Sequence, residues 1–316
     1  MLFALVTKLF IMAFIGALFF VFSGAGKNDL ASTGNYLLNK YLARAEPDKN
    51  FVSASPPKPV YATMKSPPPF QADSVYVGDV RSGGALKEEM GDEPFSIASL
   101  TKLMTALIAA EHGFDPEEAV TITADDRVAG NVEYFFPGDR VRLKDLLAAS
   151  LLASSNTAAK VLAKYIGGDK FTELMNERAR LLALKNTRFT DPTGINPGNI
   201  STAREVARLA VRTFARPEIA DFLTKPTYEI TVLNTGRKIE LKNTNRLLGG
   251  ELDRDDYKII GGKTGFIDES GYNLALRVAR GGDEIIVVVL GSGSKAARFL
   301  AAKSLALWAF GNFKWQ

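Results

Sequence analysis

The chain has 316 residues, of which 46% are hydrophobic and 23% charged, so it can bury a core in one large or two ordinary domains. The absence of cysteine and the single histidine exclude thiol nucleophiles, disulfides, thiolate zinc sites and multi-histidine clusters, and we expect neither a metal nor a cofactor. The net charge of +4 lies in residues 1–72, which hold seven basic and three acidic residues, so the neutral remainder gives no electrostatic reason to expect nucleic-acid binding.

Residues 1–25 are predicted to be an export segment. Residues 9–22 form an uninterrupted apolar run of 14 residues, which suits the core of a signal peptide better than a full membrane span. Counted from Met1, the segment is also long enough to serve as an uncleaved anchor, with Lys8 extending its amine to the interface. Small residues at 23–25 offer a cleavage site, so both outcomes stay open, and in both the body is exported.

Residues 26–72 are predicted to be a juxtamembrane segment followed by a proline-rich linker. Seven of the 14 prolines fall between Pro47 and Pro69. Such a stretch is typical of a semi-rigid, extended spacer. We expect it to tether a catalytic domain, residues 73–316, to a membrane.

The body begins with a predicted strand over residues 74–80 and continues with a mainly helical region. A buried helix face is indicated by apolar residues at the spacing i, i+3, i+4, i+7 and i+8, namely Leu100, Leu103, Met104, Leu107 and Ile108. The only histidine, His112, ends this helix before Gly113. We interpret it as a cation near a helix C-terminus rather than the base of a catalytic triad.

Four further helices are marked by their ends. Apolar residues over 143–151 stop at the polar break 154–156, and the pair 167–168 of glycines ends the next helix. Asp169 can cap the helix that follows. The pattern Thr202-x-x-Glu205 predicts a capping box at the start of another.

Strands dominate the rest of the chain. A turn at Asn234-Thr235-Gly236 predicts a hairpin between two of them. The predicted elements are strands over 227–232, 237–242, 257–264, 272–278 and 284–290, and a closing helix over 294–310 that we expect to pack on the sheet. The order predicts an α+β fold in which an antiparallel sheet is flanked by helices and carries an inserted all-α subdomain.

A Ser-x-x-Lys pair opens the first buried helix. The spacing of Ser99 and Lys102 places the hydroxyl and the amine on one face, near hydrogen-bond reach. A lysine desolvated in an apolar, cationic setting can be neutral enough to act as the base for a serine nucleophile. The pair alone is a weak signal, because Ser292-Gly293-Ser294-Lys295 has the same pattern.

Two further motifs follow in order and strengthen the first. Ser154-Ser155-Asn156 is the only Ser-x-Asn in the chain, and Lys263-Thr264-Gly265 is the only Lys-Thr-Gly. Three such elements in this order form the active-site set of the penicillin-binding proteins and serine β-lactamases.

The residues around these motifs resemble those of the low-molecular-mass penicillin-binding proteins, the serine-type D-alanyl-D-alanine carboxypeptidases. The resemblance covers residues 73–316 and includes the segments 96–106, 152–159, 191–194, 201–205, 262–266 and 270–274. It implies a β-lactamase/DD-peptidase-like fold and a hydrolase that trims peptidoglycan stem peptides. It also implies β-lactam antibiotics as covalent inhibitors and a location outside the bacterial cytoplasmic membrane, tethered or secreted.

The resemblance assigns catalytic roles to four residues. Ser99 would attack the carbonyl between two D-alanines and form an acyl-enzyme, and Lys102 would take its proton. Ser154 would relay a proton to the leaving amine, while Asn156 would hold Lys102 and the substrate amide.

Four more residues would bind the substrate. Lys263 would supply positive potential, and Thr264 would bind the terminal carboxylate. Gly265 and Phe266 would bind the substrate from the same strand. The backbone N–H groups of Ser99 and Phe266 would form the oxyanion hole.

One departure from the family leaves the reaction open. Many of these carboxypeptidases carry a basic residue near the start of the strand after the Lys-Thr-Gly strand. The segment matched to it here, residues 281–285, carries acids instead, although Arg277 and Arg280 lie nearby in the sequence. The alternative is therefore an endopeptidase that cuts D-Ala cross-links. A β-lactamase is a weaker alternative, because such an enzyme normally needs a carboxylate that positions the deacylating water, and Asp191, the only acid in the matching loop, belongs to a different pattern. A non-catalytic cell-wall-binding protein is a further alternative. Because the chain ends at the closing helix, we expect membrane attachment through the N-terminal segment.

Overall fold

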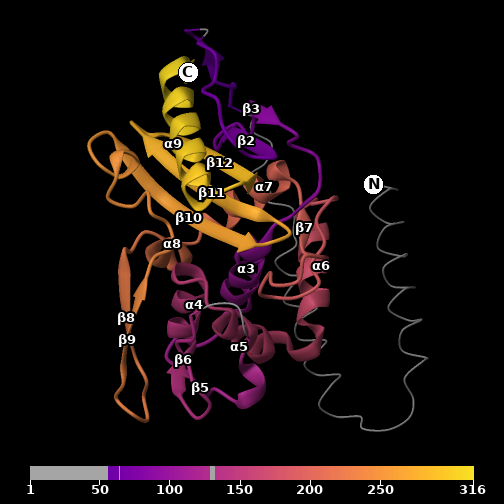
Figure 1. Cartoon of the computed structure of the whole chain (residues 1–316), viewed down its shortest axis with the longest axis vertical. Helices are drawn as coiled ribbons and strands as arrows, with labels where there is room; N and C mark the ends of the chain where they lie inside the picture. Colours follow the sequence, from indigo (N-terminus) through magenta and orange to yellow (C-terminus); the bar gives the residue numbers. More distant parts are fainter. Residues whose placement is uncertain (1–55, 64, 129–131) are drawn as a thin grey trace, which may run out of the picture. The chain divides into compact units, whose positions relative to one another are not determined.

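An antiparallel sheet of five strands lies at the centre of the fold in the computed structural model (Figure 1). The structure describes residues 56–63, 65–128 and 132–316, which belong to one compact unit. The sheet order is β10 (Tyr257–Ile267), β11 (Gly271–Arg280), β12 (Asp283–Ser292), β2 (Ser74–Asp79) and β3 (Ala85–Glu89). The export segment predicted for residues 1–25, and the predicted linker up to residue 55, lie outside the described residues. Among the described residues, no helix is long and apolar enough to cross a membrane.

Two parts of the chain that are far apart in the sequence pair within this sheet. Strand β2 pairs antiparallel with β12, with Val77 opposite Val287, although 210 positions separate these residues in the chain numbering. The strands β10, β11 and β12 follow one another as consecutive hairpins. The predicted sheet and the α+β class are therefore confirmed.

The central strands are buried on both faces. In β12, Val287 and Val289 belong to one apolar cluster and Ile286 and Val288 to another. Each such side chain contributes about 1.5–3 kcal/mol when it is fully removed from water. The sheet therefore lies between two layers of helix.

The helix α9 (Lys295–Asn312) covers one face of this sheet, as predicted for the closing helix (Figure 1). The other face packs against α7 (Ala203–Phe214). The remaining α-helices of the described residues are α3 (Lys102–His112), α4 (Leu143–Leu152), α5 (Asn156–Gly167), α6 (Phe171–Leu181) and α8 (Pro217–Leu223).

The helix α3 is the centre of the helical layer. All of its residues from Lys102 to Ala109 are buried, which is the pattern of a helix surrounded by protein on every side. It follows directly on the 3₁₀ turn η1 (Ala98–Thr101) and ends at Gly113, which is left-handed with φ +73°. His112 is its last residue, at the end opposite Lys102, so the interpretation of His112 as a helix-end residue is confirmed.

Two of the predicted helix ends are corrected by the structure. Asp169 lies within the 3₁₀ turn η3 (Gly168–Lys170), and α6 begins with Lys170 at its N-cap and no side-chain cap. The hydroxyl of Thr202 does cap α7 by accepting from the N–H of Glu205. The Glu205 carboxylate does not return to Thr202, because it accepts from the N–H of Asn186.

Short strands were missed in the region predicted to be helical. They are β3, the pair β4 (Phe95–Ser96) with β7 (Ile200–Ser201), and the pair β5 (Ala119–Thr121) with β6 (Arg140–Arg142). The predicted hairpin is present as β8 (Thr227–Thr231) and β9 (Lys238–Lys242), and the remaining turns η2 (Ala124–Asp126) and η4 (Glu251–Asp253) are 3₁₀ helices.

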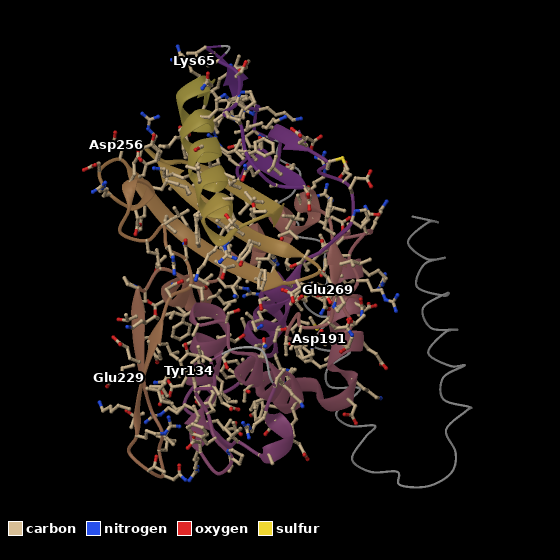
Figure 2. The ribbon with its side chains drawn as sticks, in the orientation of Figure 1. Lys65, Tyr134, Asp191, Glu229, Asp256 and Glu269 are labelled. Carbon is tan, nitrogen blue, oxygen red and sulfur yellow. The ribbon has the colours of Figure 1, made fainter. Side chains whose placement is uncertain are left out.

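Part of the predicted linker contacts the end of the chain. Strand β1 (Val60–Tyr61) pairs with β13 (Phe313–Lys314), and the indole N–H of Trp308 donates to the carbonyl of Lys65 at 2.8 Å. Figure 2 labels Lys65 beside the C-terminal end of α9. Residues 60–63 and Lys65 are therefore held on α9 and β13.

Candidate active site

The segment that carries Ser99 is bent and tightly packed. Ala98 has φ +46°, an unfavourable value for a residue with a side chain, and Ser99 follows it in η1. Gly194 has φ +81°, and a Cβ atom there would lie 2.0 Å from the carbonyl oxygen of Ala98. The backbone of Gly265 is also close, since its Cβ would lie 3.2 Å from the nitrogen of Ser99. Two distant segments thus fix the position of Ser99.

Lys102 is fully buried and makes three hydrogen bonds. Its Nζ donates to Ser99 Oγ at 2.9 Å, to Asn156 Oδ1 at 2.7 Å and to the carbonyl of Thr193 at 2.5 Å. Burial lowers the pKa of Lys102 to about 7, against the opposing effect of the Asp191 carboxylate. Of the three partner oxygens, only the Ser99 hydroxyl can also donate a hydrogen bond, because the other two are carbonyl oxygens. The lone pair of a neutral Lys102 amine must therefore face Ser99.

The Asp191 carboxylate organises the loop that presents Thr193. It accepts from the N–H groups of Thr193 at 2.6 Å, Gly194 at 2.8 Å and Asn196 at 3.1 Å, and from Asn199 Nδ2 at 2.5 Å. Burial acts to raise the pKa of Asp191, but these hydrogen bonds outweigh it and hold the pKa below its usual value. A charged Asp191 therefore fixes the Thr193 carbonyl against Lys102, a contact that no local pattern in the sequence indicated.

Ser154 and Lys263 form a second buried pair. Ser154 lies between α4 and α5 with φ +60°, and its Oγ accepts from Lys263 Nζ at 2.7 Å. Lys263 is fully buried in β10 and also donates to the carbonyl of Thr264 at 3.0 Å. Burial lowers the pKa of Lys263 well below its usual value, and the charges of Lys102 and Arg298 lower it further. The two lysines thus disfavour each other's charged forms.

The end of β10 presents the other predicted binding residues. The hydroxyl of Thr264 donates to that of Thr244 at 2.8 Å. Phe266 is 45% exposed, and its ring stacks on Tyr272 with 4.2 Å between centroids. The structure therefore brings the Ser-x-x-Lys, Ser-x-Asn and Lys-Thr-Gly motifs together at one place.

A further cation was missed in the sequence. Arg298, on α9, is only 4% exposed and donates to the carbonyls of Gly265 at 2.8 Å and Asn273 at 3.3 Å. Burial lowers the pKa of Arg298 to about 10. Nothing in the sequence pattern pointed to it, because it lies on a helix far along the chain from the Lys-Thr-Gly motif.

The two arginines that the sequence offered for carboxylate binding make other contacts. Arg277 Nε donates to Glu284 at 2.6 Å. Arg280 donates to the carbonyl of Phe310 at 3.1 Å and lies over the ring of Tyr257. Both pair with partners at the far end of the sheet from Lys263, so the cation beside the motif is Arg298.

A groove of about 280 Å³ reaches this site. It is lined by residues from the Ser99 turn, from α5, from the loop after Asp191 and from the end of β10: Ser99, Asn156, Gly194, Ile195, Phe266, Ile267, Asp268 and Glu269. Figure 2 labels Asp191 and Glu269 on this side of the fold. Ser99 is thus open to a substrate, while Lys102 and Lys263 are fully buried.

The Ser-x-x-Lys sequence at residues 292–295 lies in a different environment. Ser292 is buried at the end of β12, and its Oγ has no hydrogen-bond partner among the described residues. Among all the residues that the structure describes, no group of three or more His, Asp or Glu residues is placed to hold a metal ion.

Comparison with known proteins agrees with this geometry. Residues 61–294 match the family described as D-alanyl-D-alanine carboxypeptidase. The chain belongs to the D-alanyl-D-alanine carboxypeptidase family. It is accordingly a serine-type DD-peptidase, a hydrolase, and the resemblance seen in the motifs is confirmed.

This DD-peptidase is similar both to relatives named endopeptidases and to relatives named carboxypeptidases. It is 31% identical to a D-alanyl-D-alanine endopeptidase of Pseudomonas aeruginosa over 89% of this chain and 88% of the relative. It is 32% identical to the D-alanyl-D-alanine carboxypeptidase DacC of Escherichia coli over 78% of this chain and 63% of the relative.

A solved structure supports the fold class. Penicillin-binding protein D2 of Listeria monocytogenes, in a cefotaxime-bound form, matches with a TM-score of 0.69 and 29% identity, over 78% of this chain and all of that chain. The predicted DD-peptidase-like fold is therefore confirmed.

Proposed function

We propose that this DD-peptidase removes the terminal D-alanine from peptidoglycan stem peptides through an acyl-enzyme on Ser99. The observation that carries the proposal is the buried Lys102, hydrogen-bonded to Ser99 Oγ at 2.9 Å and with a pKa lowered to about 7. About half of such a lysine is neutral at pH 7. Neutral Lys102 takes the hydroxyl proton as Ser99 Oγ attacks the carbonyl carbon between the two D-alanines.

The oxyanion that forms is stabilised by backbone N–H groups. We assign this role to Ser99 and Phe266, because the close approach of Gly265 to Ser99 brings the two segments side by side. Preorganised donors of this kind contribute about a hundredfold to a thousandfold in rate.

The leaving D-alanine needs a proton on its amine. Ser154 is suited to supply it, because its hydroxyl is held by Lys263 at 2.7 Å. The Ser154 proton passes to the amine as the C–N bond breaks, and Ser154 recovers a proton from the lysine pair. Water then attacks the acyl-enzyme, Lys102 accepts its proton, and the shortened peptide leaves with Ser99 restored.

The carboxylate of the terminal D-alanine is assigned to Thr264, with Lys263 and Arg298 supplying positive potential. Without substrate, burial and the charges of Lys102 and Arg298 disfavour the charged form of Lys263. A bound carboxylate opposes this by raising its pKa. The substrate itself thus restores the charge on Lys263, which in turn keeps Lys102 neutral.

Cleavage of D-Ala cross-links is the second candidate. The endopeptidase of P. aeruginosa is similar over 88% of its length, and the groove at Ser99 is also lined by residues 266–269, at and beyond the end of β10. A leaving group in a cross-link can also carry a carboxylate beside the scissile amide, so recognition by Thr264 is compatible with both reactions.

The location of the reaction follows from the same proposal. Peptidoglycan lies outside the cytoplasmic membrane, so residues 1–25 would export the chain and remain as an anchor or be cleaved. Residues 26–72 would then lead from this segment to the catalytic domain, residues 73–316, and their described part packs on α9 and β13 of that domain. β-Lactams would acylate Ser99 as mimics of the D-Ala-D-Ala terminus.

The test uses the full chain and purified muropeptides. Mass spectrometry before and after incubation distinguishes the loss of one alanine from the splitting of dimers. Ser99→Ala should abolish both reactions and labelling by fluorescent penicillin, while Ser292→Ala, in the second Ser-x-x-Lys sequence, should retain them. Labelling of Ser99→Ala at the wild-type level would refute the assignment of the nucleophile.

A further inference from the structure

One side of the groove is acidic. Asp268 and Glu269 follow directly on β10, line the groove together with Ser99, and are both exposed. Neither carboxylate forms an ion pair with a described residue, and no lysine or arginine lines the groove. A substrate that reaches Ser99 therefore passes two uncompensated negative charges.

The strand β10 fixes which part of the substrate meets these charges. In the proposed function, the carboxylate of the leaving D-alanine lies at Thr264 and the scissile carbonyl oxygen lies at the N–H of Phe266. The acyl part of the peptide then continues past Phe266 toward Ile267. An extended peptide and a strand both advance about 3.3 Å per residue. The residue before the penultimate D-alanine, the third of the stem, therefore lies beside residues 267–269.

The walls of the groove suit an aliphatic side chain that ends in a cation. Phe266 is 45% exposed and Ile195, from the loop after Asp191, is 42% exposed. The stacking of Phe266 on Tyr272 fixes one of these walls. Methylene groups can pack on the two apolar side chains while an ammonium group reaches Asp268 or Glu269.

We propose that Asp268 and Glu269 select stem peptides whose third residue carries a free side-chain amine, such as lysine, ornithine or a diamino diacid. The inference rests on the proposed function, since it uses the direction of the substrate along β10. Acylation of that amine, as in a cross-link made through the third residue, removes the charge. The enzyme then trims stems with a free amine faster than stems already acylated there.

The experiment compares two peptides with the full-length protein. One is Nα-acetyl-L-Lys-D-Ala-D-Ala and the other is its Nε-acetylated form, and D-alanine release gives kcat/KM for each. The expected preference for the free amine is about three- to tenfold, in the range of one ammonium group that interacts with two exposed carboxylates, and it falls as salt is added. The double variant Asp268→Asn with Glu269→Gln should bring the ratio close to one.

A matched control lies at the other end of the same strand. Asp256 is exposed immediately before β10, and Figure 2 shows it far from Glu269, so Asp256→Asn should keep the wild-type ratio. Equal kcat/KM values for the two peptides in the wild type, or a preference that survives in the double variant, would overturn this inference and leave the proposed function standing. If the enzyme neither releases D-alanine from these peptides nor splits muropeptide dimers, the proposed function is overturned, and this inference with it.

Discussion

Acylation of Ser99 should depend on pH through the protonation of Lys102. The pKa of Lys102 is lowered from 10.5 to about 7 because the amine is fully buried. With an ordinary pKa, roughly one lysine in three thousand is neutral at pH 7, whereas about half is neutral here. The difference is about three orders of magnitude in the population of the reactive form, equivalent to about 4 kcal/mol.

The rate constant for acylation of Ser99 should rise with pH through neutrality. Below about pH 7 the charged form of Lys102 predominates, so the second-order rate constant for acylation should fall about tenfold per pH unit. Above about pH 8 the rate constant should be level with respect to this group. The assay is labelling by fluorescent penicillin from pH 5 to pH 10, with circular dichroism at each pH to verify that the protein is folded. A rate constant that is flat from pH 5 to pH 8, or that rises only above pH 9, would refute the assignment of Lys102 as the base.

The same group should also affect stability. Folded Lys102 loses its proton at a lower pH than unfolded Lys102, so its contribution to the free energy of unfolding is fully present above about pH 10.5 and is lost as the pH falls to about 7. Lys102→Met should reduce the slope of this free energy by up to about 1.4 kcal/mol per pH unit in that window. An unchanged slope in urea titrations would show that the amine is not desolvated.

Three other predictions test the surroundings of Ser99. Gly194→Ala should cost about 3 kcal/mol or more in urea unfolding, because its Cβ would meet the carbonyl of Ala98, whereas Gly236→Ala, with φ +72° and open space, should cost about 1 kcal/mol. Arg298→Met should lower kcat/KM for D-alanine release about ten- to hundredfold, chiefly through KM, and an unchanged KM would contradict its role beside the carboxylate site. Ser154→Ala should slow acylation about 10²-fold or more at unchanged melting temperature, and a rate within twofold of wild type would exclude Ser154 as proton donor.

The local elements could be predicted because they depend on short-range spacing. The strands β2 and β12, the helix α4 and the hairpin β8–β9 all lie within one or two residues of their predicted bounds at each end. The edge strand β3 was missed because its sequence, ALKEE, is mostly polar and its residues lie at or near the surface. Its strand conformation comes from pairing with β2, which no local pattern records.

The sequence by itself determined the identity and order of the three motifs, and the i, i+3 spacing that places Ser99 beside Lys102, since backbone geometry within one turn depends on neighbouring residues. Only the tertiary structure decided that Asn156 and the Thr193 carbonyl bind Lys102, and that Arg298 is the cation at Gly265. These contacts join residues that are 33 to 91 positions apart. The lowered pKa of Lys102 belongs to the same category, because desolvation depends on all the elements that surround the amine together.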